Sequence, residues 1–179
     1  MKVVFLDIDG VLNTNFSKSK CAGFLGIDTA KVRLLKRIIE ATDAEIVLIS
    51  TWMLNFEVGA YKQTAKECKY LSNKLRKHGL KVYDKISNPK WVNRGEDLWT
   101  YIQAHPEIEQ YVILDDESFR GYYKNHELEK RWIKTLPGYK DFDHSGLTED
   151  LVEVAIKILN GEFPEVRTQK DFYEEWFCP

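Results

Sequence analysis

Two aspartates, two positions apart and directly after an apolar run, are the residues of this chain best suited to chemistry. The run at residues 3–6 predicts a short buried strand, and Asp7 and Asp9 follow it. An extended backbone points these two side chains the same way, so the carboxylates would repel each other without a cation between them. Gly10 suits a sharp turn or a close approach to a ligand. Mg²⁺ fits such a site, because it binds one or two carboxylates plus water and substrate phosphate oxygens. The alternative is an acidic turn after an edge strand.

Two further apolar runs, at residues 44–49 and 111–114, also predict strands. Each run is followed by side chains that suit phosphate or metal binding. Those side chains are Ser50, Thr51, Asp115 and Asp116. In open α/β sheets, ligands bind outside the carboxyl ends of the parallel strands. Three strands that all end on such residues therefore indicate one site rather than three unrelated turns.

These segments resemble the motifs of the haloacid dehalogenase (HAD) superfamily of phosphohydrolases. The resemblance spans roughly residues 2–150, in the superfamily's order and spacing. Among its branches, the chain is most similar to the small phosphatase domains of Swiss Army knife RNA-repair proteins and of phage proteins. The motifs that carry this similarity are DIDGVLN at 7–13, STW at 50–52, RGEDL at 94–98 and GLT at 146–148.

The resemblance implies a role for each carboxylate. Asp7 would attack phosphorus and form an aspartyl-phosphate, which splits one displacement into two easier ones. Asp9 would protonate the leaving alcohol, deprotonate the incoming water, and offer its backbone carbonyl to the metal. Asp116 would bind Mg²⁺ directly, with Asp115 in support. The alternative for this pair is an acidic helix cap ahead of Glu117.

Hydroxyl and cationic side chains would bind the phosphoryl group. By the resemblance, Ser50 binds a phosphate oxygen through its hydroxyl and the amides that follow it, beginning with Thr51. The motif also calls for a cation against phosphate and nucleophile. Arg94 is the better candidate, because it begins a predicted helix whose first amides favour anions. Lys90 is the second candidate, and for either residue a solvated surface cation is the alternative.

Strands and helices alternate along the chain, which predicts a three-layer α/β/α domain with a mainly parallel five-stranded sheet. We expect this domain to cover residues 1–160, with a C-terminal tail at 161–179 that packs on it or extends it. Asn93 and Glu96 predict a capping box. Helices are expected at 28–41, up to 77, at 93–104 and from 148 to 160, and the remaining strands at 45–50, 80–83, 111–115 and 132–136. Residues 13–27 read as a loop able to close over a site, and 116–130 have no clear assignment.

Size and composition agree with one enzyme domain and exclude several other classes. The chain has 179 residues, of which 44% are apolar, and no apolar run approaches the roughly 20 residues that span a bilayer. The N-terminus begins directly with a strand rather than a signal peptide, so we expect a cytoplasmic protein without a membrane partner. The three cysteines are widely spaced and form no C-x-x-C pair, which indicates neither disulfides nor zinc. Oligomeric state has no signature here.

The substrate is the least determined feature. The connections between motifs are too short for a large cap domain, so the site would be open to bulky substrates. Residues 62–94 contain ten Lys or Arg against two acids, whereas residues 141–179 contain ten acids against three bases. The basic segment would suit a phosphate backbone, or it is simply a solvated face. The first hypothesis is a phosphatase of nucleic-acid ends or nucleotides. The alternatives are a phosphatase of a small metabolite such as a sugar phosphate, and a catalytically silent binding module.

Overall fold

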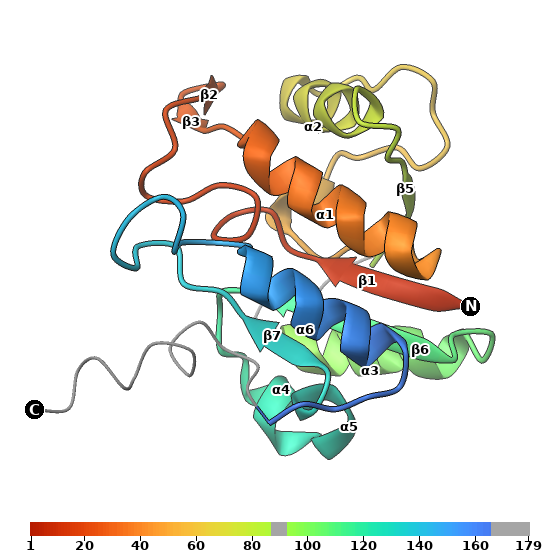
Figure 1. Cartoon of the computed structure of the whole chain (residues 1–179). Helices are drawn as coiled ribbons and strands as arrows, with labels where there is room; N and C mark the ends of the chain where they lie inside the picture. The colour runs from red at the N-terminus through yellow and green to blue at the C-terminus, as the bar shows by residue number, and fades with distance from the viewer. Residues whose placement is uncertain (87–92, 166–179) are drawn as a thin grey trace, which may run out of the picture.

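The computed structural model describes residues 1–86 and 93–165, and its centre is a five-stranded parallel sheet. The strand order is β5-β4-β1-β6-β7 (Figure 1). The strands are β1 (Lys2–Leu6), β4 (Glu45–Leu48), β5 (Val82–Lys85), β6 (Gln110–Asp115) and β7 (Trp132–Lys134). All neighbouring pairs run parallel. The predicted three-layer α/β fold with a parallel sheet is confirmed.

Helices cover the sheet on both faces (Figure 1). Helices α1 (Thr29–Thr42) and α6 (Glu149–Leu159) pack against each other on one face, and α2 (Lys66–Arg76) packs beside α1. Helix α3 (Arg94–Ala104) lies behind the sheet in this view and contacts α4 (Arg120–Lys124), which is followed by α5 (His126–Glu129). No described helix is long and apolar enough to cross a membrane.

Strand β1 lies in the middle of the sheet, and its residues Val3, Val4, Phe5 and Leu6 are fully buried. Such a strand is apolar on both faces, because helices cover both sides of a parallel sheet. From β1 the chain moves to β4 on one side, while β6 flanks β1 on the other. The strand order therefore reverses between β1 and β6. Ligands bind at such a switch point, outside the carboxyl ends of the strands.

The segment predicted as a loop at 13–27 contains a short antiparallel hairpin. Its strands are β2 (Lys20–Cys21) and β3 (Phe24–Leu25), and they form a separate two-stranded sheet. The described part of the chain contains no large cap domain, as expected, so this hairpin is the small element beside the site.

Two local expectations were wrong. The third strand begins at Val82 rather than at residue 80, because the amide of Leu80 bonds back to the Leu75 carbonyl and closes the turn after α2. Asn93 does not cap α3 with its side chain; its Oδ1 instead accepts a hydrogen bond from the Gly121 amide at 3.1 Å. That bond joins the start of α3 to α4. Because the structure describes only residues 162–165 beyond Gly161, the division into domain and tail stays a prediction.

Candidate active site

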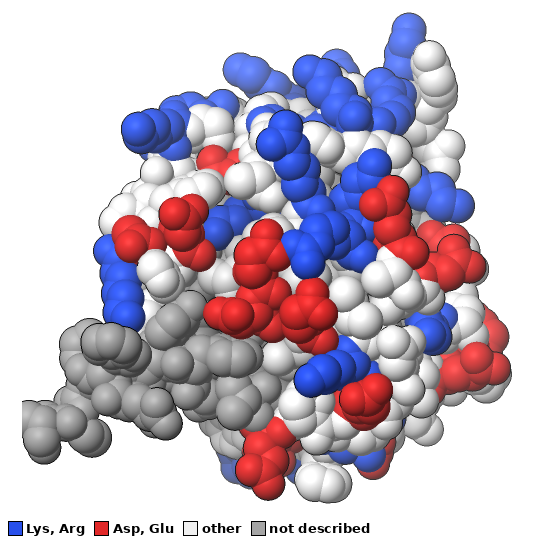
Figure 2. Space-filling model, viewed as in Figure 1, with Lys and Arg blue, Asp and Glu red and all other residues white. Residues whose placement is uncertain are grey.

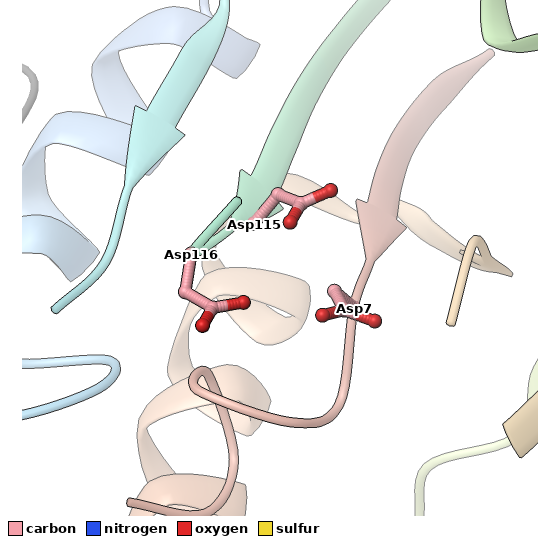
Figure 3. Close-up of side chains that lie close together, drawn as sticks. All are labelled: Asp7, Asp115 and Asp116. Carbon is pink, nitrogen blue, oxygen red and sulfur yellow. The ribbon is translucent and has the colours of Figure 1, made fainter. Parts of the chain in front are cut away.

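Three aspartates meet where β1 and β6 end, and we call them the acidic cluster: Asp7, Asp115 and Asp116. Asp7 directly follows β1, Asp115 is the last residue of β6, and Asp116 comes next. Their carboxylates turn toward one another in Figure 3, and one oxygen from each lies within 4.8 Å of the others. The amide of Asp7 donates to the Leu114 carbonyl at 2.9 Å, which joins the two strand ends. The sheet itself thus brings together residues that are more than a hundred positions apart.

Gly10 lets Asp116 approach the loop that follows β1. Its φ of +75° is one that residues with a side chain rarely adopt. A Cβ at this position would lie 2.3 Å from Cγ of Asp116, far inside van der Waals contact. The Gly10 carbonyl accepts a hydrogen bond from the Thr135 hydroxyl at 2.8 Å, which fixes the turn from the other side. Only glycine fits this position.

Arg94, the first residue of α3, is the positive charge beside the acidic cluster. Its Nη1 lies 2.6 Å from Oδ2 of Asp115 and 3.6 Å from Oδ1 of Asp7. The guanidinium also lies over the Phe119 ring, 4.5 Å from its centroid. With its side chain only 11% exposed, Arg94 is a buried counterion rather than a surface cation.

Asp115 is fully buried and held through both of its carboxylate oxygens. Besides Arg94, Oδ2 accepts from the Tyr122 hydroxyl at 2.8 Å, and Oδ1 accepts from the Glu117 amide at 2.9 Å. These donors suit a carboxylate that supports and orients the site. The next helix, α4, begins at Arg120 with Phe119 at its N-cap position, so neither Asp115 nor Asp116 caps that helix. Tyr122 was not among the predicted site residues, because no structure was predicted for its segment.

Burial and mutual repulsion shift the cluster's acid–base behaviour. Burial raises the pKa of Asp7 to about 8; the charge of Asp115 adds to this rise, whereas Arg94 and a hydrogen bond with Ser50 oppose it. Burial and the Asp115 charge raise the pKa of Asp116 to about 6. Although burial lowers the pKa of Arg94, the charges of Asp115 and Asp7 raise it above its ordinary value. The single positive charge of Arg94 therefore does not balance the negative charge of the ionised acidic cluster.

Asp9 differs from the buried cluster, because its carboxylate is exposed and opens onto a pocket. The Asn13 side chain donates to its Oδ1 at 2.7 Å, and the Trp52 indole donates to its Oδ2 at 2.9 Å. Asn13 is fixed in turn, because its Oδ1 accepts from the Gly10 amide at 3.0 Å. Two carboxylates two residues apart thus lie in contrasting environments.

One family model matches the chain over residues 3–151, and it describes a HAD domain in Swiss Army Knife RNA repair proteins. The chain belongs to this HAD family. No curated protein and no solved structure matches the chain. The predicted superfamily and branch are confirmed. Membership of this family supports a HAD-type phosphohydrolase in general.

A divalent cation fits the acidic cluster of this HAD domain. When all three carboxylates are ionised, they and the guanidinium of Arg94 carry charges of −3 and +1, or −2 in all. Carboxylate oxygens are the ligands that Mg²⁺ prefers. A cation among them would offset the burial and repulsion that raise the pKa of Asp7 and Asp116.

Three of the four predicted phosphate-binding residues, Ser50, Thr51 and Arg94, are described by the structure and lie around the same strand ends. Ser50 follows the residue after β4, is fully buried, and its side chain hydrogen-bonds with Asp7. Thr51 is exposed and lines the pocket onto which Asp9 opens. Lys90 lies outside the described residues. Of the two candidate cations, Arg94 is the one that the structure places at the cluster.

A pocket of about 600 Å³ lies between the loop after β1, the hairpin and α2, and we call it the entry pocket. Its floor includes Asp9, Gly10 and Asp116, and its walls include Phe24 and Trp52. Phe24 is 75% exposed at the hairpin. The other lining residues are Asn13, Thr14, Asn15, Cys21, Ala22, Leu25, Thr51, Glu67 and Pro137. The pocket thus brings the aromatic side chains of Phe24 and Trp52 together with the acidic residues Asp9 and Asp116.

Proposed function

We propose that this HAD domain is a Mg²⁺-dependent phosphomonoester hydrolase that acts through an aspartyl-phosphate, on nucleic-acid ends or nucleotides. The observation that carries the proposal is the contrast between Asp7 and Asp9. Asp7 belongs to a buried, metal-fitting cluster beside a guanidinium, whereas Asp9 is exposed to the pocket through which a substrate would enter. Such a pair divides the roles of nucleophile and acid–base group.

The reaction would have two displacements at phosphorus. In the first, an oxygen of Asp7 bonds to phosphorus, the bond to the ester oxygen breaks, and Asp9 gives its proton to the leaving alcohol. In the second, water bonds to phosphorus, Asp9 takes its proton, and the bond to Asp7 breaks to release inorganic phosphate. Bound Mg²⁺ supplies the positive charge that lets an anionic carboxylate approach an anionic phosphate. Arg94 orients Asp7 and Asp115, and Ser50 hydrogen-bonds the nucleophile.

Hydrolysis of an aryl phosphate tests the chemistry. We expect activity with Mg²⁺ and none in excess chelator. Asp7→Asn should abolish hydrolysis, and it should also prevent trapping of a covalent phosphoenzyme. Asp9→Asn should be severely impaired, because it cannot move the proton. Full activity of Asp7→Asn, or of the wild type without divalent metal, would rule out the mechanism.

Two surface features support a nucleotide or nucleic-acid end as substrate. The aromatic walls of the entry pocket suit a base, which stacks on aromatic rings regardless of its identity. Lys and Arg gather along the top of Figure 2, over α2 and the hairpin, whereas Asp and Glu gather lower, over α6. Exposed Lys20 precedes pocket residue Cys21, and exposed Lys66 precedes pocket residue Glu67. Positive charge therefore flanks the pocket, where a phosphate backbone would continue.

The ten cations predicted as one strip do not all belong to this surface. Arg94 is buried in the site, and Lys74 is half-buried, with its Nζ bonded to the Thr29 hydroxyl at 3.2 Å. Lys85 is also half-buried and bonds to the Met53 carbonyl. Among the members that the structure describes, the exposed ones are Lys62, Lys66, Lys69, Arg76, Lys77 and Lys81. We define the basic rim as exposed Lys20 and Lys66, because they directly adjoin the pocket residues Cys21 of the hairpin and Glu67 of α2.

Salt dependence tests the substrate class. A 3′- or 5′-phosphorylated oligonucleotide should be hydrolysed with a higher kcat/KM than its mononucleotide, and its advantage should fall steeply with added salt as counterion release weakens. Charge reversal of the basic rim should erase that advantage while aryl phosphate hydrolysis persists. Lys124→Glu with Lys157→Glu is the matched control, since both lysines are exposed on other helices. Equal rates and parallel salt dependence for both substrates would favour a small metabolite instead.

A further inference from the structure

The Trp52 indole is a hydrogen-bond donor aimed at the exposed acid of the site. Its Nε1 lies 2.9 Å from Oδ2 of Asp9, across 43 positions of sequence. An indole has only this one donor and no acceptor, so its single hydrogen bond is committed to Asp9. Asn13 donates to the other oxygen, which leaves the carboxylate bonded on both sides.

The backbone and ring of Trp52 are themselves held in place. Trp52 lies in the short helix η1 (Thr51–Met53), and its amide donates to Oγ of Ser50 at 3.4 Å. Its ring packs at a tilt on Tyr70, with 6.2 Å between centroids. The Tyr70 hydroxyl in turn accepts from the Ile27 amide at 3.1 Å, just beyond the hairpin. Trp52 is therefore held by Ser50 in its own turn and by Tyr70 of α2, and it can fix Asp9 rather than follow it.

We propose that Trp52 is a positioning residue, whose indole N–H holds the Asp9 carboxylate in the orientation from which it protonates the leaving alcohol. This inference rests on the proposed phosphatase function. An exposed aspartate samples several rotamers, and only an orientation toward the ester oxygen transfers a proton. Each carboxylate oxygen has a second lone pair, so a hydrogen bond from Trp52 leaves room for the transferred proton. The ring of the same residue lines the entry pocket, so the leaving group lies beside the acid that protonates it.

Trp52→Phe removes the N–H and keeps an aromatic wall, which separates positioning from packing. The need for an acid depends on the leaving group, because an alkoxide requires a proton far more than a nitrophenolate does. We expect kcat/KM for an alkyl phosphate to fall about tenfold or more, because that factor corresponds to the loss of a hydrogen bond to a charged group. For nitrophenyl phosphate, kcat/KM should fall about twofold or less. A benzothienylalanine at position 52, which replaces the indole N–H by sulfur, should behave like phenylalanine. Trp99→Phe on α3 is the control.

A second measurement does not depend on activity. The indole N–H of Trp52, identified in nitrogen–proton spectra by its loss in Trp52→Phe, should exchange slowly with solvent. Asp9→Ala should shift this signal and speed its exchange. An unmoved indole signal, or equal losses of kcat/KM for alkyl and aryl phosphates, would overturn the inference. A wild type without phosphatase activity would overturn the proposed function instead, and the indole signal alone would then decide whether Trp52 holds Asp9.

Discussion

The acidic cluster and the wall of the entry pocket are built in opposite ways. Asp115 and Asp7 are 0% and 4% exposed, and their backbones are parts or direct continuations of central strands. Phe24, in the wall, is 75% exposed and belongs to a strand of two residues. The sheet therefore fixes the groups that would perform chemistry, whereas a short hairpin and a single helical turn present the groups that would meet the substrate. Substitutions in the acidic cluster should therefore reduce catalysis strongly, whereas substitutions in the pocket wall should change substrate recognition more mildly.

The two regions also differ in whether protein groups or water surround their side chains. In the acidic cluster, charged and hydroxyl groups of the protein itself surround Asp115, so losing one leaves a buried charge without a partner. At the wall, the apolar surfaces remain in contact with solvent. Substitutions in the two regions should therefore affect activity by very different factors.

The largest effect is expected from Arg94→Ala. It removes the only guanidinium that the structure places beside Asp7 and Asp115, in the described residues, so kcat/KM for aryl phosphate should fall at least about a hundredfold, as when a preorganised electrostatic group is lost. Steady-state kinetics would measure this. Arg131→Ala is the matched control: Arg131 is also buried and bonded to a carboxylate, that of Glu127, but lies outside the site. It should cost stability and leave kcat/KM nearly unchanged. If Arg94→Ala loses less than the control, the cluster does not depend on its counterion.

The next effect concerns stability and pH without metal. Burial raises the pKa of Asp7 from 3.8 to about 8, so the folded state holds a proton that the unfolded chain releases. This contribution is fully present below pH 3.8 and is lost as the pH rises through about 8. In chelator, Asp7→Asn should therefore become progressively more stable than the wild type between about pH 5 and pH 8. Thermal or urea unfolding would measure the difference.

Mg²⁺ supplies the control for that measurement. We expect Mg²⁺ to bind the ionised cluster, so it should stabilise the wild type more at the upper end of this pH range and Asp7→Asn much less. Identical pH slopes for the two proteins would mean that Asp7 is ionised in the folded protein without help from a metal.

The smallest effect on activity is expected from a substitution in the wall of the entry pocket. Phe24→Ala should raise KM for a phosphorylated nucleotide about fivefold or more, because stacking of one base contributes about 1–3 kcal/mol. It should leave hydrolysis of glycerol phosphate, which has no ring, and the unfolding temperature unchanged. Phe16→Ala is the control, since this phenylalanine lies in the same connection but not in the pocket lining. Equal effects on both substrates would show that Phe24 supports the hairpin rather than the base.

The sequence was most informative where a strand ends. Apolar runs stop because the chain leaves the core, so the positions of Asp7, Ser50 and Asp115 at one edge of the sheet follow from hydrophobicity alone once the sheet is parallel. The resemblance to the HAD superfamily then matched each of these strand ends to one of the superfamily's motifs. Their assigned roles remain predictions for the experiments above.

Features that depend on tertiary contacts were beyond sequence reasoning. The hairpin strands have two residues each, too few for an alternating pattern. Trp52 and Tyr122 reach the site through hydrogen bonds that no local periodicity encodes, although Trp52 adjoins a motif that the sequence singled out. Asn93 carries the signature of a cap, but the close approach of α3 and α4 gives its side chain another partner.

The hydroxyl of Thr135 on the Gly10 carbonyl has a consequence for how the protein is made. The first motif is synthesised before the other motifs of the domain, yet its turn is completed by a residue 125 positions later, and its acidic partners Asp115 and Asp116 precede that residue only shortly. Until Asp115 and Asp116 have been added to the chain, Asp7 lacks the acidic neighbours that help to raise its pKa. Until then the acidic cluster, which a divalent cation would fit, is incomplete. The site forms late, together with the second half of the sheet.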